Sequence, residues 1–193
     1  MLQSEIERLA KDGQATVALN LSTVTRTMQR TVERELARVR LAAPHRVSEA
    51  KVASVIEQIV RVIQRTPEGE RLDWIVEVPA HIVAPVDHDD LSEAAGNLIE
   101  NAARHARHSV TVAAQGDEKS VSLTISDDGP GIPQDQVQEV LRRGGRLDER
   151  GSGAGLGLAI ASEIVESWNG TLTLDAAKPG LIATLRFAAP PRS

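Results

Sequence analysis

The chain has 193 residues, enough for one domain of ordinary size with a small appendage. Its hydrophobic content of 41% allows a core, which leucine, valine, isoleucine and alanine must fill because only two tryptophans and one phenylalanine are present. The net charge of −5 argues against a nucleic-acid partner, the lack of cysteine excludes disulfides and thiol chemistry, and no apolar run approaches the roughly eighteen residues of a membrane span.

Residues 1–44 show the apolar spacing of helices. A first short stripe ends at Gly13. A second stripe advances in steps of three and four residues, close to a heptad repeat, and consists of Val17, Leu21, Val24, Met28, Val32, Leu36 and Val39. A long exposed helix with one apolar seam needs a partner, so we interpret this region as part of a helical hairpin that packs on itself and on a second chain. A helix docked on the chain's own domain is the alternative.

Residues 46–63 predict a helix, because their apolar positions recur at helical spacing. The sequence Thr-Pro-Glu-Gly at 66–69 predicts a turn. Residues 72–78 alternate as in a strand, and residues 83–86 predict a short second strand.

The next predicted helix carries two different faces. We expect Asp89 or Asp90 to cap it, with Glu93 completing a capping box behind Asp90. One face is apolar and consists of Leu91, Ala95, Leu98 and Ala102. A second face is polar and consists of Asn97, Asn101, Arg104 and His105, at i, i+4, i+7 and i+8. Alone, such a polar stripe is typical of a solvated helix, and the motifs after it favour a binding face.

A hairpin and a dense set of glycines follow. Residues 110–112 and 121–125 predict paired strands. Eight of the fourteen glycines lie between Gly129 and Gly157. Glycine this dense costs chain entropy, and the usual reason is close approach of the backbone to a ligand. The helical spacing of residues 159–165 predicts a helix N-terminus after these glycines, which is typical of a phosphate site.

Two common nucleotide-binding loops do not fit these glycines. A P-loop requires Gly-Lys, and none of the fourteen glycines is followed by lysine. The dinucleotide fingerprint requires a third glycine or alanine where this chain has Leu156 or Leu158.

The last strands complete the expected architecture. Asn169 and Gly170 predict a turn into strands at 171–174 and 181–187. The last four strands thus form two hairpin-like pairs, while helices alternate with strands earlier. This order predicts an α+β fold, a two-layer sandwich with a mixed sheet and helices on one face.

Three motifs together resemble the sensor histidine kinases of bacterial two-component systems. Residues 97–106 look like their N box, residues 127–131 like their G1 box, and residues 153–158 like their G2 box, in the family's order and spacing. The resemblance covers residues 47–188 and implies the GHKL, or Bergerat, ATP-binding fold shared with gyrase B, Hsp90 and MutL. It also implies transfer of the ATP γ-phosphoryl group to a histidine of a dimerisation domain, for relay to an aspartate of a response regulator.

The resemblance implies that ATP and Mg²⁺ bind at these motifs. Asp127 matches the aspartate that recognises adenine. A carboxylate there accepts a hydrogen bond from the exocyclic amine of adenine, whereas guanine has a carbonyl at the equivalent position. Asn101 matches the Mg²⁺ ligand, and Asn97 the residue that orients a water or a phosphate oxygen, so both are the expected catalytic residues. Arg104 matches a phosphate contact and His105 a ring near adenine and ribose. The remaining expected nucleotide contacts are Gly129, Gly131, Ile132, Gly153, Ala154, Gly155, Leu156, Gly157 and Leu158.

The segment between the two glycine motifs departs from the usual family pattern. Residues 133–150 hold no aromatic residue where histidine kinases carry a phenylalanine-containing box. The segment resembles the lid of PhoQ-like sensor kinases. Arginines in such a lid can close over the triphosphate, and Arg143, Arg146 and Arg150 are the candidates for this role.

In the family, a two-helix dimerisation hairpin with the phosphoacceptor histidine precedes the ATP domain. Residues 1–44 look like part of that hairpin without the acceptor, and residues 45–193 like the catalytic ATP-binding domain. None of the five histidines carries the acceptor's flanking pattern, so we expect no self-phosphorylation. The expected partners are ATP or ADP, a second protomer and a response regulator receiver domain, with neither nucleic acid nor membrane contact. The expected setting is the cytoplasmic part of an inner-membrane sensor.

Two other functions remain open. In a gyrase-like ATPase switch, a glutamate four residues before the metal asparagine activates water, and this chain has the amide Asn97 there. A non-catalytic nucleotide-binding module needs no intact motifs, whereas Asn101, Asp127 and both glycine motifs are present. A serine kinase of the anti-sigma type also fits the fold, but the apolar seam before residue 44 fits a dimerisation hairpin better.

Overall fold

The computed structural model describes residues 48–133, 136 and 157–188. All of them belong to one compact unit, Val47–Ser193. The predicted hairpin of residues 1–44 and the predicted lid arginines lie outside the described residues.

Five strands form one mixed sheet in the order β2-β4-β5-β7-β6. The strands are β2 (Asp73–Glu77), β4 (Ser109–Gly116), β5 (Ser120–Asp127), β6 (Thr171–Ala176) and β7 (Leu181–Ala188). Strand β2 runs parallel to β4, and all other neighbours are antiparallel. Both predicted strand pairs are confirmed, as the hairpins β4–β5 and β6–β7.

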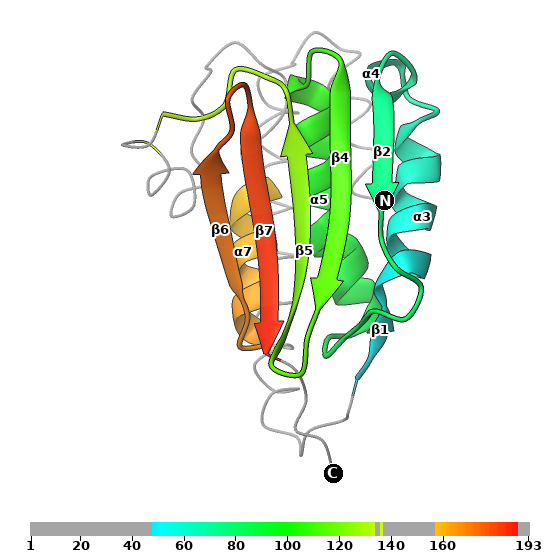
Figure 1. Ribbon diagram of the computed structural model, residues 1–193, viewed down its shortest axis with the longest axis vertical. Helices are drawn as coiled ribbons and strands as arrows, with labels where there is room; N and C mark the ends of the chain where they lie inside the picture. The colour runs from blue at the N-terminus through cyan, green and yellow to red at the C-terminus, as the bar shows by residue number, and fades with distance from the viewer. Residues whose placement is uncertain (1–47, 134–135, 137–156, 189–193) are drawn as a thin grey trace, which may run out of the picture. The chain divides into compact units, whose positions relative to one another are not determined.

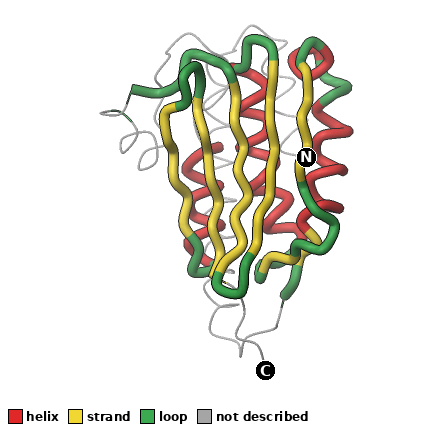
Figure 2. The backbone as a smooth tube through the Cα atoms, viewed as in Figure 1, coloured by secondary structure: helices red, strands yellow, loops and turns green. Residues whose placement is uncertain are grey.

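Helices lie on one face of this sheet (Figures 1 and 2). The helices are α3 (Val52–Ile63), α5 (His88–His105), α7 (Gly157–Ser167) and the single turn α4 (Pro67–Glu70). The predicted α+β two-layer sandwich is therefore confirmed. None of the helices in the described ranges is long and apolar enough to cross a bilayer.

The core lies between the helices and the inner face of the sheet. Along β4 and β5 every second side chain is buried, as expected for a sheet covered on one face. Helix α5 contributes its predicted apolar face, since Leu91, Ala95, Leu98 and Ala102 are all buried. Phe187 is 1% exposed and is the largest fully buried side chain of the described residues.

The helix predicted over 46–63 begins later, at Val52. Ala50 and Lys51 form the short strand β1 (Ala50–Lys51), which pairs antiparallel with β3 (Val83–Ala84). A two-residue strand has no period for the sequence to show, so the sequence pattern could not separate it from the helix that follows.

The predicted cap of α5 was also wrong by a few residues. Asp87 is the N-cap, and its Oδ1 accepts a hydrogen bond from the backbone N–H of Asp89 at 2.9 Å. Asp89 and Asp90 lie in the first turn instead, where negative charge stabilises the N-terminal end of the helix dipole.

Candidate functional site

The polar face of α5 lies against the start of α7. The Nδ2 of Asn97 donates to the backbone oxygen of Glu93 at 2.8 Å, which fixes the direction of the Asn97 amide. A Cβ on Gly157, the first residue of α7, would lie 3.1 Å from Asn97 Oδ1. Glycine at this position therefore lets the second glycine motif contact the asparagine motif closely.

One turn later, Asn101 is half-buried, and its side chain makes no hydrogen bond with any other residue that the structure describes. Its amide oxygen is thus available to a ligand. Arg104 forms an ion pair with Glu100 at 2.7 Å on the exposed side of the helix. Exposed pairs of this kind are weak, so this contact does not hold Arg104 away from a phosphate.

Asp127 ends β5 and is the one buried polar residue in the described part of the chain, at 6% exposure. Its Oδ1 accepts from the backbone N–H of Gly129 at 2.8 Å, and the N–H of Leu181 also donates to this carboxylate. Burial raises the pKa of Asp127, and this effect outweighs the two amide hydrogen bonds and the nearby His105. The fold therefore holds a carboxylate in a fixed orientation at a cost in solvation.

Two glycines allow the backbone to close around Asp127. A Cβ on Gly129 would overlap the backbone oxygen of His105, and a Cβ on Gly180 would overlap the backbone oxygen of Asp127. Gly180 also has a φ of +107°, which favours glycine. The β6–β7 turn therefore lies against the loop after β5, where Gly131 faces the carbonyl of Gly180.

The sequence did not reveal that contact. Nothing in the sequence around Pro179 and Gly180 points to Asp127, which lies about fifty residues earlier in the chain. The role of the Leu181 amide was likewise invisible, because a backbone group leaves no signature in the sequence.

Asp128, the residue after Asp127, is held by backbone amides. Its side chain is only 22% exposed. Its carboxylate accepts hydrogen bonds from three successive backbone amides, those of Arg107, His108 and Ser109, at 2.8 to 3.2 Å. These amides hold the pKa of Asp128 far below its usual range.

The described residues thus bring together two parts of the predicted site. Asn97 contacts Gly157, while His105 lies beside Gly129 and near Asp127. Ile132 packs against the core, and Leu158 is buried within it at 7% exposure. The predicted site residues outside the described ranges are Arg143, Arg146, Gly153, Ala154, Gly155 and Leu156.

No group of three histidine, cysteine or carboxylate side chains in the described ranges could hold a metal by itself. A cation at this site would need oxygens from a ligand and from water in addition to the Asn101 amide. Mg²⁺ fits that arrangement, since it keeps several waters and commonly binds through substrate phosphates.

Comparison with known proteins agrees with this geometry. The family described as "Histidine kinase-, DNA gyrase B-, and HSP90-like ATPase" matches residues 86–192. The sensor protein kinase CarS of Pseudomonas aeruginosa is 44% identical over 111 residues, which cover 58% of this chain and 25% of that protein. The two-component sensor PhoQ of the same organism is 34% identical over 139 residues, covering 72% of this chain and 31% of that protein.

A solved structure gives the same result. The mycobacterial sensor histidine kinase MprB superposes with a TM-score of 0.67 at 28% identity, covering 75% of this chain and all of that one. This chain spans between a quarter and a third of the length of the curated relatives CarS and PhoQ. The resemblance inferred from the three motifs is confirmed: the chain belongs to the histidine kinase-, DNA gyrase B- and HSP90-like ATPases, as a catalytic ATP-binding domain of the sensor histidine kinase type.

Proposed function

We propose that this chain binds ATP with Mg²⁺ and transfers the γ-phosphoryl group to a histidine of a sensor kinase. The observation that carries the proposal is the buried Asp127 carboxylate at the end of β5, beside the α5 face that holds Asn97 and Asn101. Family membership supports ATP as the nucleotide.

Asp127 would select the base. A carboxylate oriented by the amides of Gly129 and Leu181 accepts a hydrogen bond from the amine of adenine but meets the carbonyl of guanine with repulsion. Because this carboxylate is buried, the hydrogen bond forms in a low-dielectric environment, where a charge-assisted contact is strong.

Asn101 and Asn97 would act at the phosphate end of the nucleotide. Asn101 offers an amide oxygen to Mg²⁺, which when bound neutralises charge on the triphosphate. Asn97 is held by Glu93 and Gly157, so it can orient a phosphate oxygen or a water without reorganisation. Arg143 and Arg146 are proposed as further phosphate contacts from the lid.

A water-activating ATPase is the weaker alternative. Asn97 cannot act as a base, since an amide does not accept a proton at neutral pH. Glu100 precedes Asn101, but successive residues of a helix point about 100° apart, and Glu100 is exposed. We therefore expect ATP hydrolysis by this chain to be slow, which favours phosphoryl transfer to a protein acceptor over an ATPase switch.

The acceptor and partners follow from the kinase proposal. We propose that the acceptor histidine lies on a dimerisation hairpin, that residues 1–44 contribute to such a hairpin with a second protomer, and that a response regulator takes the phosphoryl group onward. His105 is a poor acceptor candidate, because it lies beside Gly129 at the proposed base end of the site rather than in line with the γ-phosphate.

The substitution Asp127→Asn tests base recognition. We expect it to weaken ADP binding by about 1–3 kcal/mol, since it removes the charge from the hydrogen bond to adenine. Isothermal titration calorimetry measures the change, with Asp175→Asn on the exposed side of β6 as the control that leaves affinity unaltered. Unchanged ADP affinity in Asp127→Asn would remove this residue from the site.

Transfer in trans tests the kinase activity. The chain is incubated with γ-labelled ATP, Mg²⁺ and a full-length sensor kinase of this family whose own ATP site has been disabled. We expect an acid-labile, alkali-stable label on that partner, no label on the chain alone, and no transfer by Asn101→Ala. Release of labelled phosphate without protein label would instead support the ATPase switch.

The pH dependence of stability tests the cost of burying Asp127. Because the pKa of Asp127 is raised on folding, ionisation opposes folding above that pKa and has no effect below the unfolded-state pKa. Asp127→Asn should therefore raise the urea midpoint at pH 7, with the gain disappearing as the carboxyl is protonated at low pH.

The opposite sign is expected for a control residue. The pKa of Asp117 is lowered by the amides of Lys119 and Ser120, so its stabilisation is present above the unfolded-state pKa and is lost as the pH falls through the folded one. Asp117→Asn should lower the urea midpoint at pH 7. If Asp127→Asn lowers the urea midpoint at pH 7 as Asp117→Asn does, the account of Asp127 is incorrect.

A further inference from the structure

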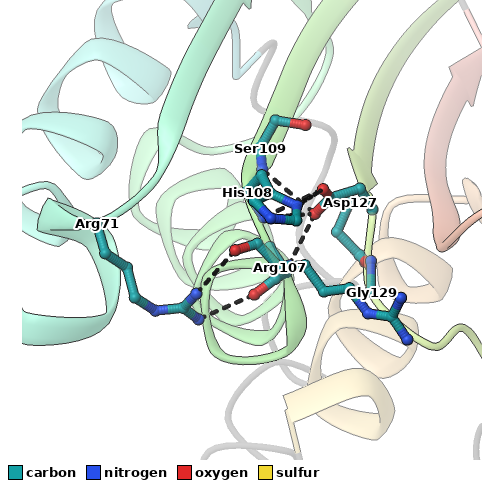
Figure 3. Close-up of polar contacts among 8 residues, drawn as sticks. Arg71, Arg107, His108, Ser109, Asp127 and Gly129 are labelled. Atoms are coloured by element: carbon teal, nitrogen blue, oxygen red, sulfur yellow. Dashed lines mark hydrogen bonds and ion pairs between the residues drawn. The ribbon is translucent and has the colours of Figure 1, made fainter.

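Two charged side chains hold the short link between α5 and β4, residues 106–108. The first is Arg71, which lies between α4 and β2. Its guanidinium donates to the backbone oxygens of Ala106 at 2.9 Å, Arg107 at 3.1 Å and Ala103 at 3.4 Å. Figure 3 shows Arg71 reaching the backbone at Arg107. A cation at this place satisfies the last carbonyls of α5 and stabilises the negative end of the helix dipole.

The second side chain is Asp128, directly after the strand-ending Asp127. Its carboxylate accepts from the three amides that lead into β4, and the Nδ1 of His108 lies 3.1 Å from it. Successive amides that point to one place form an anion site, and here a carboxylate of the protein itself occupies that site. The positively charged Arg71 therefore binds the carbonyls of the link, and the negatively charged Asp128 binds its amides.

The position of this link sets the position of the base end of the site. The backbone oxygen of His105, immediately before the link, lies where a side chain on Gly129 would be. Gly129 in turn donates its N–H to Asp127. A shift of the link would move His105, and the Gly129 amide that orients the Asp127 carboxylate would move with it.

We propose that Arg71 and Asp128 are positioning residues of the nucleotide site, which hold the end of α5 against the loop after β5 so that Asp127 and Gly129 face the base correctly. This inference rests on the proposed nucleotide binding. Neither residue belongs to the polar face of α5 or to the residues expected to contact ATP. They act through His105, Gly129 and Asp127.

Asp128→Asn and Arg71→Met are the test substitutions. In Asp128→Asn, the side-chain NH2 group is a donor that faces backbone N–H donors. In Arg71→Met, the side chain keeps its apolar stem but loses the guanidinium N–H groups. We expect each substitution to weaken ADP binding about tenfold, because each removes one network of charge-assisted hydrogen bonds. In the trans-phosphorylation assay, KM for ATP should rise about tenfold while kcat changes by less than about twofold, because the phosphate end of the site is intact.

Asp117→Asn is the matched control. Asp117 also accepts from two backbone amides, but it does so in the β4–β5 turn, at the other end of the same hairpin. Its substitution should lower the urea midpoint and leave both ADP affinity and KM unaltered. Measurements on folded protein, verified by circular dichroism, separate positioning from general stability.

The outcomes distinguish the two proposals. If the unaltered protein does not bind ADP, the proposed function fails. If it binds ADP and both variants bind equally well, the positioning role of Arg71 and Asp128 is overturned while the proposed function stands. Should Asp128→Asn not fold, Arg71→Lys decides the question: it keeps the charge but not the fork, so weaker binding supports the proposal and full affinity contradicts it.

Discussion

Burial of the Asp127 carboxylate is the constraint on which the site depends. Taking a carboxylate out of water is unfavourable, as its raised pKa reflects, so the surrounding backbone must supply donors. Those donors come from Gly129 and Leu181, in two segments far apart in the chain. Both segments can approach only because Gly129 and Gly180 lack side chains. A single charged group thus fixes the geometry of a strand end, a loop and a hairpin turn.

Helix α5 joins this site to the core. Its apolar face is buried against the sheet, whereas its other face carries Asn97, Asn101 and His105. The N-terminal end is capped by Asp87, and at the C-terminal end Arg71 binds the carbonyls of Ala103 and of the C-cap residue Ala106. Since both ends and one face of α5 are fixed, the packing of the domain determines the positions of Asn97 and Asn101. Such preorganisation is what phosphoryl transfer requires, because the protein contributes mainly orientation and charge.

The sequence predicted the layers, both hairpins and the two faces of α5, because each depends on a regular period of apolar residues. The density of the glycines singled them out without a structure, and the resemblance of residues 127–131 to the G1 box singled out Asp127. The predictions failed where no period exists, at the two-residue strand at Ala50 and the cap at Asp87, and they did not reveal the contacts of Asp128. Gly180 escaped notice because its constraint is a contact with Asp127, distant in sequence. Long-range backbone contacts of this kind leave no local pattern.

Base selectivity tests the central claim most directly. Calorimetric titration of the unaltered protein with ADP and with GDP, both with Mg²⁺, compares nucleotides that differ only in the base. If the buried Asp127 carboxylate reads the exocyclic amine of adenine, ADP binds and GDP binds at least about tenfold more weakly, as the loss of one charge-assisted hydrogen bond predicts. Equal affinities for ADP and GDP would contradict the account.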